Sequence, residues 1–305
     1  MNCLLCNKKA KKFRSKIRNS LKRNVYRCEY CSLEFLEANN DNLEEWYRKD
    51  YRKDHSPTIS NAKSSNAKLF FESVGPTLGI RIEKYKKYLK KNYHVLDVGC
   101  AAGAWLHAMK PFVKKVSGVE LNREHAKFVQ KELNIDCFND QIQFLNEDIK
   151  YDLITCFHTL EHIADPFNFI EEIKKRLKPK GKVIFEVPNL DDVLISTFNN
   201  NEYKDFYYTK PHLFYYNNKT LMKLFNKAGF VGKNYGIHRY NYGNLMHWEQ
   251  QRFPQASNTI CMAEPSLKIN NNKLNDLIKK QELDYKSLLE KKLISEAIYF
   301  VGSKK

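Results

Sequence analysis

Residues 96–103 read LDVGCAAG, and this stretch decides the fold. An apolar strand that starts at His94 runs into a turn with two glycines, which lets backbone N–H groups approach a ligand at the carboxyl end of the strand. Glu120 comes 23 positions after Asp97, at the end of the next expected strand, where a carboxylate can accept hydrogen bonds from ribose hydroxyls. The glycine turn and the acid together predict a nucleoside-cofactor site.

Strands and helices are predicted to alternate around this turn. Short apolar runs predict strands, and amphipathic or charged runs between them predict helices. We expect strands at 94–99, 116–120, 151–157 and 182–187, with helices at 80–91, 123–133 and 167–177. Further along, the pattern predicts a helix at 220–228, an extended segment at 230–240, a charged helical stretch at 267–292 and a strand at 297–301. This alternation predicts an α/β fold with a mostly parallel sheet.

Composition places the chain among globular proteins. With 305 residues, 42% of them hydrophobic, it can bury one large core, or a core and a small satellite domain. Eleven glycines and nine prolines exclude a collagen-like or low-complexity chain. The sequence has no uncharged apolar run of about 18 residues and no apolar segment near its N-terminus, so we expect a cytoplasmic protein without a membrane span.

Four cysteines in two close pairs predict a structural zinc site. Tetrahedral zinc takes four thiolates, and two such pairs supply them with no coordination position left open, although a redox dithiol is an alternative. The pairs are Cys3 with Cys6 and Cys28 with Cys31, separated by 21 residues. The scattered cysteines are expected to be buried thiols: Cys100, Cys137, Cys156 and Cys261.

Positive charge is concentrated beside these cysteines. The chain has 52 Lys and Arg against 35 Asp and Glu, a formal net charge of +17, and residues 1–36 alone hold a net +8. A basic surface can attract nucleic acid, acidic membranes or phosphorylated substrates. A lysine-rich solvated surface is the other interpretation.

The acid at the head of the glycine turn bears on which cofactor binds. A dinucleotide site prefers three glycines under a pyrophosphate, which Asp97 would repel, whereas a carboxylate suits the amino-acid end of a cationic sulfonium. The turn at 96–103 resembles the first motif of class I S-adenosylmethionine-dependent methyltransferases, with Ala101 where the family usually has Gly. The stretches at 119–120, at 151–154 with 157–166, and at 177–183 are similar to the later motifs of the family, in the same order.

This resemblance covers about residues 80–240. It implies a Rossmann-like seven-stranded sheet whose last strand is antiparallel, with S-adenosylmethionine as cofactor. It assigns the methionine end, the ribose, the adenine and the sulfonium to a set of residues at the strand ends: Asp97, Gly99, Cys100, Gly103, Glu120, Leu121, Asn139, Phe157 and His158. Asn139 is assigned where the expected third strand is poorly marked.

The cysteine pairs ahead of this fold look like bacterial sugar C-methyltransferases, which carry a four-cysteine zinc domain and act on nucleotide-linked deoxysugars. In those enzymes a Glu-His pair serves as the base; His212 falls on that His, but Pro211 replaces the Glu, so oxygen, nitrogen and carbon acceptors all stay open. Tyrosines around His212 could line an acceptor pocket or belong to the core: Tyr203, Tyr207, Tyr208, Tyr215 and Tyr216.

Three alternatives stay open. An RNA methyltransferase would grip its substrate with the basic zinc module, although residues 156–159 lack the Asn/Asp-Pro-Pro-aromatic turn typical of base methylation. A non-catalytic binding protein on a degenerate fold is the second. Third, some related methyltransferases bind Mg²⁺ through a Glu-x-x-Glu-His run, whose counterparts here are His158, Glu161 and His162; an imidazole is a poor ligand for a hard cation.

The expected organisation has three parts. A zinc-binding module occupies 1–36, an aromatic and polar connecting and lid segment occupies 37–79, and a methyltransferase domain occupies 80–305 with a helical insertion at about 241–293. The predicted enzyme methylates a small molecule, a sugar or nucleotide-linked sugar of surface glycan synthesis.

Overall fold

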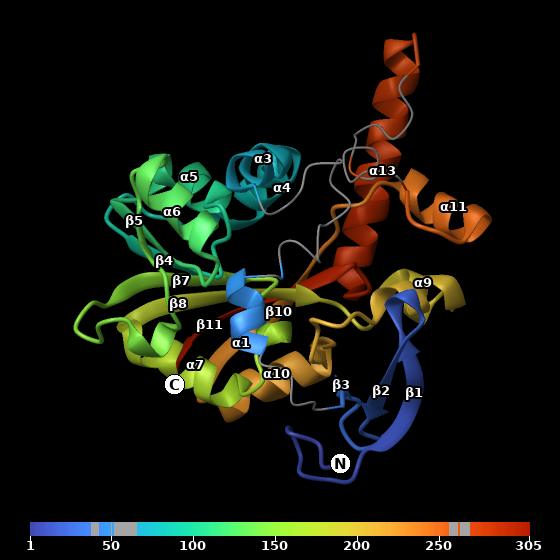
Figure 1. Ribbon diagram of the computed structural model, residues 1–305. Coiled ribbons are helices and arrows are strands. Elements are labelled where there is room, and N and C mark those ends of the chain that lie inside the picture. The colour runs from blue at the N-terminus through green and yellow to red at the C-terminus, as the bar shows by residue number, and fades with distance from the viewer. Residues whose placement is uncertain (38–42, 50, 52–65, 256–261, 263–268) are drawn as a thin grey trace. The chain divides into compact units, whose positions relative to one another are not determined.

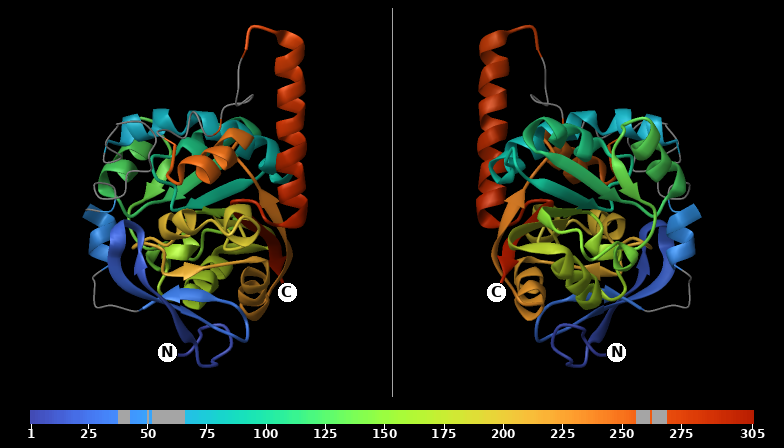
Figure 2. Two further views of the ribbon diagram at one scale, coloured as in Figure 1. Left: turned by 90° about the vertical axis from the view of Figure 1, so that its right-hand side faces the viewer. Right: turned by 90° about the vertical axis from the view of Figure 1, so that its left-hand side faces the viewer.

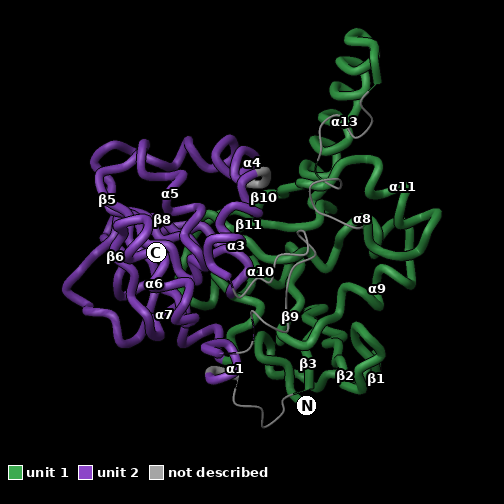
Figure 3. The backbone as a smooth tube through the Cα atoms, turned by 45° about the horizontal axis from the view of Figure 1, so that its top comes forward, with its two compact units in different colours: residues 1–39, 160–164, 186–301 green, residues 40–159, 165–185, 302–305 purple. Residues whose placement is uncertain are grey.

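The chain forms two compact units in the computed structural model, which describes residues 1–37, 43–49, 51, 66–255, 262 and 269–305 (Figure 1). One unit combines residues 1–39, 160–164 and 186–301, and we call it unit 1; the other, unit 2, combines 40–159, 165–185 and 302–305 (Figure 3). Among the residues described, no helix is both long and apolar enough to cross a bilayer.

A seven-stranded sheet has the strand order β10-β11-β8-β7-β4-β5-β6. β4 pairs in parallel with β5 and β7, β5 pairs in parallel with β6, and the last strand, β11, is antiparallel. The strands are β4 His94–Val98, β5 Lys115–Val119, β6 Asp136–Phe138, β7 Tyr151–Phe157, β8 Leu177–Pro188, β10 Phe230–Ile237 and β11 Ala297–Lys304. The predicted α/β fold is therefore confirmed.

Unit 2 holds the central strands of this sheet and the helices that follow them. Val95 of β4 is in register with Leu153 of β7, and Leu96 with Ile154, and all four side chains are fully buried. Its helical segments are α1 Leu43–Lys49, α3 Ala67–Ser73, α4 Gly75–Tyr85, η2 Lys86–Tyr88, α5 Ala104–Met109, η3 Lys110–Phe112, α6 Arg123–Lys131, η4 Ile142–Phe144 and α7 Pro166–Arg176.

The starts of two of these helices follow from side-chain caps. Asn122 accepts a hydrogen bond from the backbone N–H of His125 at the start of α6, and Asp165 caps α7 in the same way with proline at the next position. The Asn122 cap begins α6 directly after the end of β5, which keeps the connection between strand and helix short.

Unit 1 holds a second, four-stranded sheet with the order β1-β2-β3-β9. Its strands are β1 Lys11–Ile17, β2 Leu21–Arg27, β3 Glu34–Leu36 and β9 Phe214–Tyr215. β3 pairs antiparallel with β9, so that Glu34 faces Tyr215 and Phe35 faces Phe214. The N-terminal segment therefore shares a sheet with the residues that follow His212.

The remaining helical segments of unit 1 are η1 Arg18–Ser20, η5 Leu160–His162, α8 Val193–Ser196, α9 Asn201–Tyr207, α10 Asn218–Lys227, α11 Tyr242–Gln251 and α13 Asn272–Lys292. α13 is a single long helix (Figure 2). Near its C-terminal end a buried ion network joins the chain on either side of it, because Arg239 donates to Glu186 at 2.7 Å and to Glu296 at 2.8 Å.

Several predicted boundaries differ from those observed. The helix predicted at 80–91 is α4 Gly75–Tyr85 followed by η2 Lys86–Tyr88. β8 begins at Leu177 rather than at 182, because the neighbouring strand β11 also runs further than predicted, to Lys304, and Lys304 Nζ donates to Leu177 O at 2.5 Å.

The compact units also cut across the three predicted parts of the chain, since β3 pairs with β9. Much of the predicted lid segment, and Cys261, lie outside the described residues. The predicted insertion contains α11 and α13.

Candidate active site

The glycine turn after β4 bends sharply enough to need positive φ at three positions. Gly99 has φ +78°, Ala101 has φ +48° and Gly103 has φ +75°, and the N–H groups of Gly99 and Cys100 both donate to Val119 O, at 2.8 and 3.1 Å. A Cβ atom at Gly99 would lie 2.2 Å from Thr159 Oγ1. Glycine is therefore required at this position, both for the backbone angle and for the space.

Glu120 is anchored at the end of β5 by two backbone N–H groups. Its Oε2 accepts from Ala101 N and its Oε1 accepts from Asn122 N, each at 2.8 Å, and the side chain is buried. Each carboxylate oxygen has a second lone pair, so the anchored group can still accept hydrogen bonds from a diol. One carboxylate thus links the β4 turn to the residues after β5.

Asn139 lies directly after β6 and reaches the same place. Its side-chain Nδ2 donates to Glu120 O at 2.7 Å and to Leu121 O at 2.9 Å. Of the assigned cofactor residues, Asn139 was the one with the poorest sequence marking, and the structure brings it to Glu120 and Leu121. The role of the three residues in binding stays a prediction.

Asp97 is a buried carboxylate on β4. Thr155 Oγ1 of β7 donates to its Oδ1 at 2.7 Å. Burial raises the pKa of Asp97 to about 7, although the Thr155 hydrogen bond and the charge of Arg81 act to lower it. A carboxyl group with a pKa near 7 can lose its proton and become negatively charged when a cationic group binds beside it. The sequence assigned no role to Thr155 or Arg81, which lie in the strand expected at 151–157 and the helix expected at 80–91.

Phe157 and His158 end β7. The Phe157 ring stacks on Tyr85 at 5.1 Å between centroids and meets Trp105 edge-on at 5.5 Å, while the Arg81 guanidinium lies 4.9 Å from its centroid. His158 has φ +50°, an uncommon angle for a residue other than glycine. The aromatic packing by Tyr85 and Trp105 holds the turn after β7 in place, and sequence reasoning missed both residues.

His212 belongs to a group of three titratable side chains in unit 1. Glu161, His162 and His212 each offer a ligand atom within 4.8 Å of the others, and the two imidazole rings lie 4.9 Å apart. His162 Nδ1 contacts Pro211 O at 2.9 Å, and Leu213 N donates to Glu161 O at 2.7 Å, so η5 is fastened on both sides of His212. The Mg²⁺ site considered from the sequence would join Glu161 and His162 with His158, whereas the structure brings them together with His212.

The tyrosines around His212 are buried, and three of their hydroxyls bond to protein groups. Tyr203 donates to Asp192 Oδ2 at 2.9 Å, Tyr208 to Glu34 Oε2 at 2.5 Å and Tyr215 to Thr209 O at 3.1 Å. These three are core residues. Among the residues described, the hydroxyls of Tyr207 and Tyr216 have no hydrogen-bond partner, and both side chains are buried like those of the other three tyrosines.

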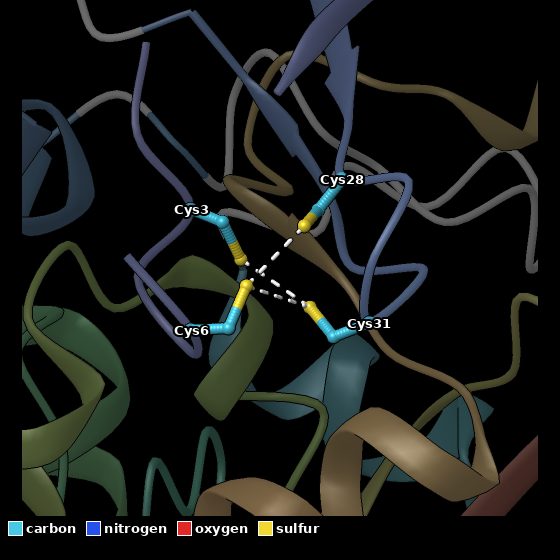
Figure 4. Close-up of side chains that lie close together, drawn as sticks. All are labelled: Cys3, Cys6, Cys28 and Cys31. Carbon is cyan, nitrogen blue, oxygen red and sulfur yellow. Dashed lines mark hydrogen bonds between the residues drawn. The ribbon is translucent and has the colours of Figure 1, made fainter. Parts of the chain in front are cut away.

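The four N-terminal cysteines point toward a common centre (Figure 4). Cys3 Sγ lies 3.4 Å from Cys31 Sγ, and Cys6 Sγ lies 3.4 Å from Cys28 Sγ and 3.8 Å from Cys31 Sγ. Four sulfurs at 2.3 Å from a tetrahedral zinc ion would be about 3.8 Å apart, so the residues fit this ion.

The thiols of this cluster differ in pKa, since burial raises the pKa of Cys3 and of Cys31 whereas the pKa of Cys28 is lowered. Burial would raise the pKa of Cys28, but backbone N–H groups of Cys31 and Tyr30 and the Cys6 thiol outweigh burial and lower the pKa to about 7. A thiol with this pKa gives up its proton readily to a metal ion near neutral pH.

This strand order, with a glycine turn after β4 and an anchored acid after β5, defines a class I S-adenosylmethionine-dependent methyltransferase domain. A family profile described as "Methyltransferase domain" matches residues 76–232, just over half of the chain, and the chain belongs to this family.

Two curated relatives and one solved structure show how far the similarity extends. The "Ubiquinone biosynthesis O-methyltransferase" of Coxiella burnetii (strain RSA 493 / Nine Mile phase I) is 36% identical over 107 residues, 32% of this chain and 45% of that one. Its namesake in Idiomarina loihiensis is 30% identical over 102 residues, 31% of this chain and 42% of that one. The chain therefore spans less than half the length of these relatives. A structure described as "DhpI-SAH complex structure" has a TM-score of 0.51 at 12% identity, covering 87% of this chain and 98% of the other, which shows the fold.

Proposed function

We propose that the chain transfers a methyl group from S-adenosylmethionine to a small molecule, and that this acceptor is a sugar or a nucleotide-linked sugar. The use of S-adenosylmethionine as methyl donor is supported above all by the Glu120 carboxylate. It is held by Ala101 N and Asn122 N at the carboxyl ends of two adjacent parallel strands. Nucleoside ligands of open α/β sheets bind at that edge, and an anchored acid there accepts from the ribose.

The reaction is a displacement at the sulfonium methyl. A lone pair on the acceptor attacks the methyl carbon, the carbon–sulfur bond breaks, and its electron pair leaves with S-adenosylhomocysteine. Alignment of acceptor and methyl supplies much of the rate. Where the acceptor is a hydroxyl, His212 takes the proton that the new ether oxygen loses.

The surroundings of His212 support this role. Glu161 is fully buried, and its carboxyl group lies within 4.8 Å of a His212 ring nitrogen, where it can help to orient the imidazole. Pro211 leaves His212 without the neighbouring Glu of the sugar C-methyltransferases, and a hydroxyl acceptor is easier to deprotonate than a carbon. Oxygen methylation is therefore the better match, and the two curated relatives are also named as O-methyltransferases.

Zn²⁺ at Cys3, Cys6, Cys28 and Cys31 is structural in this proposal. Four thiolates fill a tetrahedral shell, so no coordination position remains for a substrate. The ion would hold the start of the chain against the sheet that continues into β9, two residues after His212.

Transfer of labelled methyl tests the proposal. Purified protein is incubated with labelled S-adenosylmethionine and an extract of the source cell, which is then divided into a small-molecule pool and an RNA pool. We expect label in the small-molecule pool, its loss with Glu120→Ala, and a decrease of about 10²- to 10⁴-fold in rate with His212→Gln. Label in RNA that ribonuclease removes would overturn the choice of acceptor, and no transfer to either pool would overturn the activity.

A further inference from the structure

A basic cleft in unit 1 takes no part in the site described above. It is lined by residues 13–20 of the β1–β2 hairpin and by α9 residues between Asn201 and Phe206, and its volume is about 720 Å³. This volume lies within the range of small-molecule sites. The cleft therefore has room for a ligand of nucleotide size.

The charge of the cleft is strongly positive. Arg14, Lys16, Arg18 and Lys204 line it, and Asp205 is the single acid among the lining residues. Arg14 pairs with Asp205, which neutralises one of the four cations. Three positive charges around one small cleft favour a ligand with more than one negative charge.

Arg18 is the most distinctive of these cations, because it is held rigidly and lacks an acidic partner. Its Nε donates to Phe206 O at 2.5 Å, and its guanidinium carbon lies 3.6 Å from the centroid of the Phe206 ring. In the part of the chain that the structure describes, no carboxylate forms an ion pair with it. Burial lowers the pKa of Arg18, which is the physical sign of a cation deprived of solvent.

The hairpin itself is fixed to the segment that leads to His212. Asn19 and Ser20 both have positive φ, 61° and 57°, which produces a tight hairpin turn. The N–H of Arg18 donates to Tyr208 O at 2.7 Å. The guanidinium therefore does not need to be ordered when a ligand binds, and preorganisation of this kind increases affinity.

A path of packed rings connects the cleft with His212 inside unit 1. The Arg14 guanidinium lies 4.7 Å from the Tyr208 ring, Tyr208 lies 4.8 Å from Tyr215, and Tyr215 lies 6.0 Å from His212, all measured to ring centroids. The cations and the proposed base thus belong to one packed block, two tyrosines apart.

We propose that this cleft binds the diphosphate of a nucleoside diphosphate, as the handle by which a nucleotide-linked acceptor is held. The guanidinium of Arg18 can bind phosphate oxygens in a bidentate manner with its two terminal nitrogens, and Lys16 and Lys204 add point charges. The proposal rests on the proposed nucleotide-linked acceptor, but the cleft can be tested without methyl transfer.

Calorimetric titration of the full chain with uridine diphosphate tests the cleft directly. Arg18→Gln should weaken binding by about tenfold or more, since it removes a charged hydrogen-bond donor. Lys12→Gln is the matched control, because it removes one positive charge from the same strand outside the cleft, and it should change the affinity less than about twofold. Asp205→Asn should tighten binding, because it removes the only negative charge of the cleft. Uridine should bind far more weakly than uridine diphosphate.

A second variant and a second ligand keep the outcome clear. Lys16→Gln changes an exposed side chain that folding does not need, and it should also weaken uridine diphosphate several-fold. Titration with S-adenosylhomocysteine should give the same affinity for all these variants, which shows that they are folded. Equal uridine diphosphate affinity for wild type, Arg18→Gln and Lys16→Gln would overturn the proposal, as would an oligoribonucleotide that displaces uridine diphosphate at much lower concentration. Uridine diphosphate binding by a protein that transfers no methyl would leave the cleft standing and refute the proposed function alone.

Discussion

The glycine turn after β4 in unit 2 and the N-terminal sheet of unit 1 differ in how far apart in the sequence their parts lie. The turn after β4 is completed by Glu120 and Asn139, which come from the next two strands along the chain. The N-terminal sheet is completed by β9 Phe214–Tyr215, which pairs with β3 Glu34–Leu36 although the two strands lie far apart in the sequence. The first site depends on residues close in sequence, and the second on residues that only folding brings together.

This difference predicts that a substitution can remove ligand binding in one region without affecting the other. Each has its own polar centre, with an anchored carboxylate in one and four cysteines in the other, and the two centres lie in different compact units. A substitution at one centre should therefore leave the ligand of the other in place. Additivity of effects at distant sites with no shared partners is the general expectation.

Loss of the metal should have the largest effect. We expect the wild type to carry about one zinc per chain, and Cys28→Ser to carry none, because three thiolates leave the tetrahedral shell open. Structural zinc contributes on the order of 10 kcal/mol to the folding of small metal-bound modules, so the residues around β1–β3 should lose protection from hydrogen exchange. Metal analysis and hydrogen exchange measure both quantities.

Cofactor binding should be unaffected by Cys28→Ser. The affinity for S-adenosylhomocysteine should stay within about twofold of the wild type, because Glu120 and the β4 turn share no partner with the cysteines. Cys137→Ala serves as the control for the number of thiols and should keep its zinc. Wild-type protein purified without metal, or Cys28→Ser with a full equivalent of zinc, would refute the zinc prediction.

Glu120→Ala should have the next largest effect and the reverse pattern. It removes the acceptor of two backbone N–H groups and, in the proposed function, of the ribose hydroxyls, a loss of about 3 kcal/mol that corresponds to roughly a hundredfold weaker S-adenosylhomocysteine binding. Glu124→Gln changes an exposed acid in the first turn of α6 and is the matched control. Calorimetry measures the affinity and metal analysis the zinc, which should be retained. Unchanged affinity would remove Glu120 from the cofactor site.

The same contrast explains how much the sequence could predict. The alternation of strands and helices, the β4 turn and the acid after β5 are all contiguous patterns, and they yielded the fold and the cofactor class. The cysteine pairs were equally easy to recognise because their spacing is regular. In each case the residues that form the pattern lie close together in the sequence.

What the sequence could not predict depends on long-range packing. Thr155 lies in the strand expected at 151–157, but nothing in the sequence indicates that its hydroxyl bonds to Asp97. The pairing of β3 with β9 joins two short strands that have no distinctive pattern. The grouping of Glu161 with His212 depends on two backbone-anchored contacts that only the folded chain contains. Burial of Tyr208 and Tyr215, which decides that they are core residues, likewise follows from the sheet that β9 joins.

Asp97 gives a third test, through the dependence of stability on pH. Its pKa is about 7 in the folded chain, against an ordinary value of 3.8 that applies to the unfolded chain, so between these two pH values the folded state holds a proton that the unfolded state has released. Stability should therefore be greatest below the lower value and should fall as pH rises toward 7, by about 1.4 kcal/mol per pH unit for this group. Denaturant unfolding at pH 5 and pH 7 measures the change.

The contribution of Asp97 is isolated by comparing variants. Asp97→Asn should remove this part of the pH slope, because the amide does not titrate, whereas the exposed control Asp148→Asn should keep it. Identical slopes in the wild type and in Asp97→Asn would show that the carboxyl is ionised in the folded chain throughout this range.

The smallest expected effects come from two glycines of unit 2, and they have opposite signs. Gly99→Ala forces a Cβ atom against Thr159 at φ +78°, and the left-handed backbone alone costs about 1–2 kcal/mol for a residue with a side chain. Gly79 lies inside α4, where an added Cβ would meet nothing within 4 Å, so Gly79→Ala should stabilise the chain by up to about 1 kcal/mol through helix propensity. Denaturant unfolding measures both changes, and a stabilised Gly99→Ala would contradict the geometry of the turn.

Steric contact and backbone strain at Gly99 can be separated. Thr159→Ala in the Gly99→Ala background removes the hydroxyl that the new Cβ would approach at 2.2 Å, but it leaves the positive φ unchanged. Stability should therefore recover in part, and the remaining deficit measures the strain of the turn itself. S-adenosylhomocysteine affinity should follow the same order, because the turn presents Ala101 N to Glu120 only while Gly99 keeps its left-handed conformation. Full recovery of both quantities would mean that the turn needs glycine for space alone.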